Sequence, residues 1–208
     1  MAIQKYDELN SMHIDVLREI GSIGSGNAST SLASVTQQKI TMTVPQVQIL
    51  DINKILRILG GPEKIISAVL VKFSGDIEGI MLYLQSLEFI NVVLKSTLSK
   101  TVESYDQLTE LEYSALIEIG NIMISSYINA ITSLINVQVD LTVPANAINM
   151  LGAIMNVPMT EYGYNSDKMM IINGSIICDG QKIESDLLMI PDIPSLQTIM
   201  EKLGVPFE

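Results

Sequence analysis

Residues 116–121 read Leu-Ile-Glu-Ile-Gly-Asn, and a close copy, Leu-Arg-Glu-Ile-Gly-Ser, occupies residues 17–22, which lie 99 positions earlier. An ungapped comparison of residues 17–49 with residues 116–148 finds ten identities in 33 positions. A repeat with two copies and a period near 100 is typical of a duplicated unit folded back on itself, not of a solenoid. The sequence therefore predicts two similar halves that share one core.

The composition excludes several classes of function. The chain has 208 residues, of which 48% are hydrophobic, and a net charge of -11. Such an acidic protein is a poor partner for nucleic acid or for an anionic membrane surface, because both require a basic face. With one cysteine, Cys178, and one histidine, His13, an internal disulfide, a zinc site and a Ser-His-Asp triad are disfavoured.

The N-terminus and the apolar runs of the sequence indicate where in the cell the protein is expected. The N-terminus is too polar for a secretory signal, and no apolar run reaches the roughly 18 residues that a membrane-spanning helix needs. We expect a cytoplasmic protein without a membrane segment and without a metal or cofactor of its own.

Each half shows the same order of predicted elements after a loose lead-in over residues 1–9. For the first half we expect a helix over 11–35, a strand over 39–50 broken at Pro45, a short helix after Asp51, a hairpin over 67–73 and 77–84, and a helix over 86–98. For the second half we expect a helix over 110–135, a strand ending at Pro144, a hairpin over 168–177 and 182–190, and a helix over 194–203. Residues 145–151 fit either a second strand or the start of a short helix.

The fold class predicted from this order is α+β. We expect a single domain over residues 1–208, made of two repeats, 10–98 and 109–203, joined by a polar linker over 99–107. The unit helix–strand–helix–hairpin–helix would be related to its copy by pseudo-two-fold symmetry. Long helices would pack on a largely antiparallel sheet. Because glycine permits close approach, Gly21, Gly24 and Gly26 would face a second helix.

Glu118 and Asn121 form the central pair of the motif. Residues three apart on a helix project from one face, so these two side chains lie side by side, as do Glu19 and Ser22. The apolar residues of the motif fall on the opposite side. A solvated helix face is the ordinary explanation for such a pair. However, a purely structural repeat would preserve its apolar stripe first, and here the exposed glutamate is kept as well, which favours a functional role.

These residues resemble a known family. The motif Asp15-x-x-x-Glu19-Ile20-Gly21-Ser22 and its copy Ser114-x-x-x-Glu118-Ile119-Gly120-Asn121 are similar to the doubled motif of the CheC family of bacterial chemotaxis, which includes CheX and FliY. The resemblance covers nearly the whole chain. It implies a phosphatase that hydrolyses the aspartyl phosphate of the response regulator CheY. It also implies two long helices side by side against a sheet, and CheD, a receptor deamidase, as a possible partner.

The resemblance assigns roles to the motif. Asn121 would position the attacking water, because a carboxamide both accepts and donates hydrogen bonds, and Glu118 would pair with a lysine of the regulator. Mg²⁺ would be supplied by the regulator. In the first copy Ser22 replaces the asparagine, so the Glu19/Ser22 site is expected to be weakened. A second interpretation therefore stays open, in which the chain is an adaptor that binds CheY or CheD with little turnover.

Overall fold

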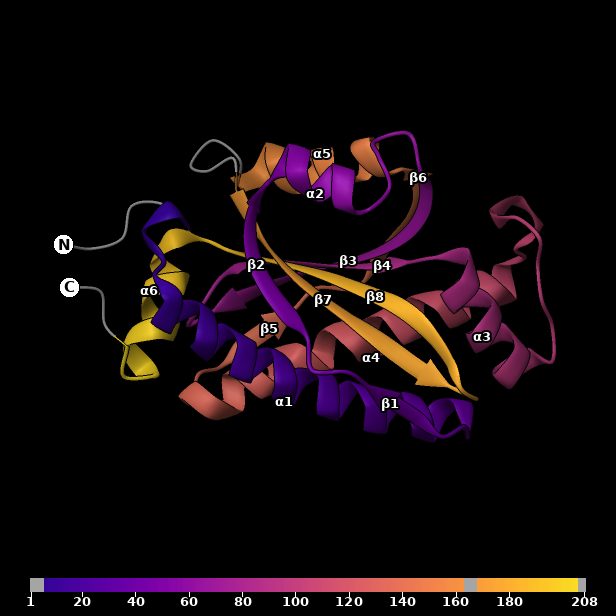
Figure 1. The fold of residues 1–208 in the computed structure, drawn as a ribbon, viewed down its shortest axis with the longest axis horizontal. Helices are drawn as coiled ribbons and strands as arrows, with labels where there is room; N and C mark the ends of the chain where they lie inside the picture. The colour runs from indigo at the N-terminus through magenta and orange to yellow at the C-terminus, as the bar shows by residue number, and fades with distance from the viewer. Residues whose placement is uncertain (1–5, 163–167, 206–208) are drawn as a thin grey trace.

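The computed structural model describes residues 6–162 and 168–205, and both halves show the expected order of elements (Figure 1). The first half contains η1 (Tyr6–Glu8), α1 (Ser11–Thr36), β1 (Ile40–Met42), β2 (Gln46–Asp51), α2 (Ile52–Ile58), β3 (Ile65–Gly75), β4 (Gly79–Gln85) and α3 (Leu87–Leu98). The second half contains η2 (Tyr105–Gln107), α4 (Glu110–Ile135), β5 (Val139–Leu141), β6 (Ala145–Met150), α5 (Leu151–Tyr162), β7 (Lys168–Cys178), β8 (Gln181–Pro191) and α6 (Ile193–Lys202).

The predicted α+β class is confirmed. Within the described residues, eight strands form one antiparallel sheet in the order β1-β7-β8-β4-β3-β5, with β2 also pairing with β7 and β6 with β3. The first two strands of each half thus pair with the hairpin of the other half. Because the halves exchange their edge strands in this way, neither half can complete the sheet alone.

The duplication in the sequence is also a symmetry of the sheet register. Gln46 of β2 pairs with Asn173 of β7, and Ala145 of β6 pairs with Leu70 of β3. Position 145 lies 99 residues after position 46, and position 70 lies 103 residues before position 173. The second pair is therefore the first pair with the two halves interchanged. The two edges of the sheet are therefore related by a pseudo-two-fold operation, as the repeat predicted.

The Thr-Val-Pro sequence found in both repeats marks a kink at each edge of the sheet. The Thr43 N–H donates to the Ser175 carbonyl over 2.9 Å, and the Thr43 hydroxyl accepts the Ser175 N–H over 2.9 Å. Thr142 makes the same pair of bonds with Lys72, at 3.0 and 3.1 Å. Proline has no N–H to continue the ladder, and just before it the threonine hydroxyl accepts an N–H that a backbone carbonyl would accept in a regular ladder.

Helices cover both faces of the sheet (Figure 1). Helices α1 and α4 lie side by side on one face, and the shorter α2 and α5 lie on the other. The central strand β4 is buried along its whole length and its side chains alternate between the two cores. Met81 and Tyr83 face α1 and α4, whereas Leu82 and Leu84 face α2 and α5. The continuous apolar run of this strand follows from burial on both faces.

Two segments refine the sequence expectations. Residues 145–150 form the strand β6, and α5 begins at Leu151, so the two alternatives left open for this stretch occur in succession. The lead-in expected over residues 1–9 is ordered at its end, where the buried Tyr6 hydroxyl donates to the Pro191 carbonyl over 2.6 Å. Residues 1–5 lie outside the described part of the chain.

Candidate functional site

The Glu118/Asn121 pair lies on the outer face of α4. Glu118 is exposed and Asn121 is half-buried, while Leu116, Ile119 and Met123 are buried beneath them. The apolar residues anchor the helix to the core, so its outer face is presented rigidly. A docked protein can therefore reach both polar side chains.

The first repeat presents the matching pair in the same way on α1. Glu19 is exposed and Ser22 is half-buried, while Leu17 and Ile20 are buried. The structure thus keeps the four predicted site residues accessible, as two separate pairs on two helices. Their chemical roles remain a prediction.

A capping box fixes the start of α4. The Glu112 carboxylate accepts the Thr109 N–H over 2.6 Å and contacts the Lys100 ammonium group, and its side chain is only 3% exposed. The hydrogen bond from Lys100, followed by that from the Thr109 backbone, lowers the pKa of Glu112 from 4.5 to about 2. On α1, the matching residue His13 closes the box by accepting the Asn10 N–H over 3.0 Å.

Replacing Glu112 with glutamine is expected to lower stability in a pH-dependent way. Because the folded-state pKa is depressed, the carboxylate contributes fully above about pH 4.5, and the contribution is lost as the pH falls towards 2. The wild type should therefore exceed Glu112→Gln in free energy of unfolding at pH 7, with the gap closing as the pH drops below 4.5. Denaturant unfolding at several pH values measures this, with the exposed Glu110→Gln as the control. A gap that does not change with pH would contradict it.

Of the three glycines of α1 that were predicted to face a second helix, one does so. A Cβ on Gly24 would lie 2.5 Å from the Tyr127 ring of α4, so this glycine faces the second helix as predicted. The prediction was wrong for Gly21, which faces Pro45 and Val47 at the sheet, and for Gly26, which has no neighbour within 4 Å. Periodicity alone did not separate the sheet-facing, helix-facing and exposed positions of one helix.

A buried hydrogen bond joins the two motif helices. The hydroxyl groups of Ser25 on α1 and Tyr127 on α4 lie 2.7 Å apart, and the absence of a side chain at Gly24 makes room for the tyrosine ring. Burial raises the pKa of Tyr127, so this hydroxyl stays protonated. The contact fixes the two helices, and hence the two polar pairs, relative to each other.

Asn121 has a neighbour on α4 that the sequence reading did not single out. The Ser125 hydroxyl, one turn further along, donates to Asn121 Oδ1 over 3.4 Å. Nδ2 of the amide then remains available, as does one lone pair of Oδ1. At the matching position of the first repeat the chain has Gly26, which offers no such bond. The spacing of four residues could have indicated Ser125 from the sequence.

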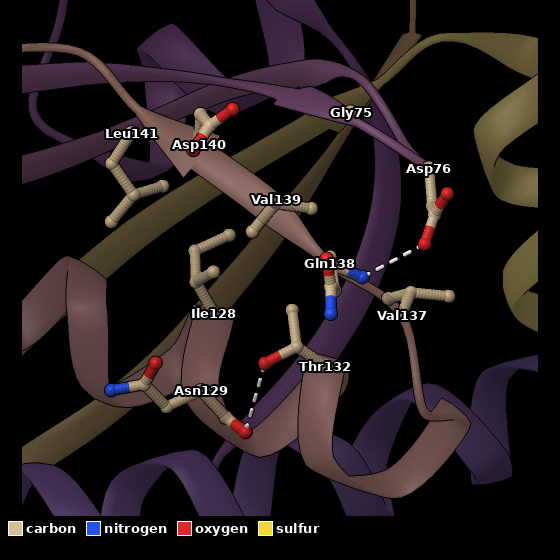
Figure 2. A pocket seen from close by; sticks show the side chains of 10 residues that line it. All are labelled: Gly75, Asp76, Ile128, Asn129, Thr132, Val137, Gln138, Val139, Asp140 and Leu141. Atoms are coloured by element: carbon tan, nitrogen blue, oxygen red, sulfur yellow. Dashed lines mark hydrogen bonds between the residues drawn. The ribbon is translucent and has the colours of Figure 1, made fainter.

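A cavity of about 580 Å³ lies towards the end of α4, away from the pair (Figure 2). It is lined by residues of α4, of strand β5 and of the turn after β3, among them Asn129, Thr132 and Asp140. At its rim, Asp76 accepts the Gln138 N–H over 2.9 Å (Figure 2). None of the four predicted site residues lines this cavity. The two pairs lie on the outer helix surfaces instead.

Within residues 6–162 and 168–205, no group of three or more histidine, cysteine, aspartate or glutamate side chains is arranged to hold a metal ion. In the same ranges, α4 is long and apolar enough to cross a membrane, but more than half of its apolar window is buried inside the protein. A core helix of a globular domain meets the same test of length and composition.

Comparison with known proteins identifies relatives over most of the chain. A model of the CheC-like family matches residues 12–49 and 111–146, which are the two copies of the helix–strand unit. The chain is 25% identical over 203 residues to the CheY-P phosphatase CheC of Bacillus subtilis (strain 168), covering 96% of this chain and 97% of that protein.

Solved structures show the same fold. The crystal structure of Thermotoga maritima FliY matches with a TM-score of 0.73 at 19% identity, covering 94% of this chain and 98% of that one. A chain of the FliG–FliM complex from H. pylori matches with a TM-score of 0.68 at 10% identity, covering 93% and 100%. At these identities the structures establish the architecture alone. The chain is therefore similar to CheC-like proteins in both copies of the motif, in a nearly full-length alignment to CheC, and in the architecture it shares with FliY.

Proposed function

We propose that this protein hydrolyses the aspartyl phosphate of a CheY-type response regulator in the cytoplasm. The observation that carries the proposal is the exposed Glu118/Asn121 pair on a helix anchored by its buried face. The name of the B. subtilis relative, a CheY-P phosphatase, supports the choice of substrate.

The reaction needs little more than positioning. A water oxygen attacks phosphorus, the bond to the aspartate oxygen breaks, and inorganic phosphate and a free carboxylate result. A carboxylate leaves without prior protonation, so no general acid is required from the enzyme. The Asn121 amide accepts a hydrogen bond from the water through Oδ1 and donates one to the phosphoryl group through Nδ2, which holds the water in line.

Glu118 serves the same reaction by binding. It lies one turn before Asn121 and is exposed, so its carboxylate can pair with a lysine of the regulator beside the phosphorylated aspartate. The Mg²⁺ that offsets phosphoryl charge belongs to the regulator in this proposal. A CheD-like deamidase is a second partner that we propose from the family resemblance.

The direct test is phosphate release from a phosphorylated CheY-type regulator in the presence of Mg²⁺. The proposal predicts release that accelerates in proportion to catalytic amounts of this protein. Stoichiometric binding with no change in the rate of phosphate loss would contradict it.

That second outcome corresponds to an adaptor function, which one feature of the chain favours. The first repeat has Ser22 in place of asparagine and Gly26 in place of Ser125, while Glu19 is retained. A site with the binding carboxylate and without the amide would hold a regulator without hydrolysing its phosphate. We assign this role to the first repeat and assign catalysis to the second.

Replacing Ser125 with alanine is expected to lower kcat about 3- to 10-fold without changing KM, because the Asn121 amide loses the bond that restricts its rotation. The melting temperature should not fall, since alanine is the better helix former. Steady-state phosphate release measures the effect, and Ser125→Thr, which keeps the hydroxyl, should restore most of it. The control is Ser133→Ala, an exposed position of the same helix. Equal losses in the two alanine variants would argue against a positioning role.

A further inference from the structure

Exposed apolar side chains occur at matching places in the two repeats. Within residues 10–50, the exposed large apolar side chains are Met12, Val35 and Val44. Their counterparts 99 positions later, Leu111, Leu134 and Val143, are also apolar and exposed. Only the valine of the Thr-Val-Pro kink is the same residue in both copies. At the other two positions the chain keeps apolar character and exposure while the residue itself has changed.

Met12 and Leu111 are distinguished from the other matching residues by where they lie. Each precedes its motif glutamate, Glu19 or Glu118, by seven residues within one uninterrupted helix. Seven residues are nearly two turns, so the side chains share a face with an offset of ~20°, about 10 Å apart along the helix axis. Val44 instead borders a groove on the other side of the sheet, beside α2.

Folding does not explain an apolar residue at these two positions. Met12 is 62% exposed and Leu111 is 65% exposed, so neither fills the core. The reciprocal side chains of the capping boxes are the next residues along, His13 and Glu112, and both are buried. An exposed methionine or leucine in the first turn of a helix contributes nothing that a polar residue could not supply.

We propose that Met12 and Leu111 are apolar anchors for the receiver domain of the phosphorylated regulator, one for each repeat. Each anchor would enter an apolar hollow about 10 Å from the phosphorylated aspartate, and this inference rests on the function proposed above. A carboxylate–amide pair alone is a small, solvated contact, whereas interfaces draw most of their affinity from a few side chains that lose contact with water on binding. The anchor supplies affinity and discriminates among receivers, and the glutamate and asparagine supply orientation and chemistry.

The charge around the anchors favours a receiver over a second copy of this chain. The exposed carboxylates of Glu19 on α1 and Glu118 on α4 lie on the helix faces of the two anchors, Glu110 is exposed next to Leu111 in the first turn of α4, and the chain carries a net charge of -11. Two copies joined through these faces would bring like charges together. A receiver that offers a lysine beside its phosphorylated aspartate complements them.

The test compares Leu111→Ala with the wild type on a CheY-type receiver domain. In phosphate release we expect KM to rise about 10-fold with kcat unchanged, which corresponds to ~1.4 kcal/mol of binding free energy. Calorimetric titration with the receiver held in its phosphorylated form by beryllofluoride and Mg²⁺ should show the same loss of affinity at one of two sites. Met12→Ala should weaken binding of the receiver at the other site.

Ile58→Ala is the matched control, because Ile58 is 55% exposed on α2, far from the pairs in the fold. If Leu111→Ala leaves KM and affinity within twofold while Asn121→Ala lowers turnover about 100-fold, the anchor is refuted and the phosphatase stands. If the wild type binds the receiver without hydrolysis and Leu111→Ala weakens binding, the anchor stands and catalysis fails. Wild-type dimers that Leu111→Ala dissociates in sedimentation would overturn the proposal in favour of self-association. Failure of the wild type to bind any receiver removes both.

Discussion

In the Asn121→Ala variant we expect phosphate release from the phosphorylated regulator to fall about 100-fold in kcat, because displacement of a positioned water is costly in a reaction that relies on positioning. The affinity for the regulator should change little, since Glu118 remains. The half-buried Asn121 amide accepts a hydrogen bond from the hydroxyl of Ser125, which is itself only half-buried, so removal of the amide leaves no buried group unsatisfied and the fold should be retained. Steady-state assays measure the effect on kcat, and a separate binding measurement gives the affinity for the regulator.

The first repeat provides the matched comparison for this variant. Ser22→Ala should lower turnover by less than twofold if the second repeat carries catalysis. Ser22→Asn should raise it, and addition of Gly26→Ser should raise it further, because that change recreates the neighbour that Asn121 has. A Cβ added to Gly26 would have no neighbouring atom within 4 Å, so a serine fits there. Near-full activity in Asn121→Ala would refute the assignment of the catalytic repeat.

Gly120→Ala is expected to destabilise the protein by about 1–3 kcal/mol, even though alanine favours a helix. A Cβ at this position would lie 2.4 Å from a methyl carbon of Val69, which is fully buried on β3. Neither the helix nor the strand can move away without loss of packing elsewhere. For a chain of this size the melting temperature should fall by roughly 2–10 °C.

The same substitution at Gly26 is the control, because that glycine is also helical and has open space around it. Gly26→Ala should raise the free energy of unfolding by about 0.5–1 kcal/mol through helix propensity alone. If denaturant unfolding shows a lower free energy of unfolding for Gly120→Ala and a higher one for Gly26→Ala, close packing against the sheet is what constrains Gly120. A stabilising Gly120→Ala would show that the helix does not lie as close to Val69 as described. Since Gly120 lies between the two site residues of α4, the variant should also lose turnover.

Much of the architecture could be predicted because it follows from local patterns. The strand breaks at Pro45 and Pro144 and the hairpin over 168–177 and 182–190 are short-range features, and the structure places strands and turns where they indicated. The exposure of Glu118 and Glu19 followed from helical periodicity in the same way. The sequence did not show which strand each edge strand would join, because pairing between the halves depends on residues about 100 positions apart.

The repeat in the sequence by itself determined that two copies of one unit face each other and that each carries a glutamate on an outer helix face. Only the tertiary structure decided the surroundings of those residues. It placed Gly21 and Gly120 against the sheet but Gly24 against Tyr127, brought the Ser25 and Tyr127 hydroxyls together, and left Leu111 in solvent. The physical reason is that periodicity specifies a direction around a helix axis. Which element lies in that direction depends on how distant parts of the chain pack together.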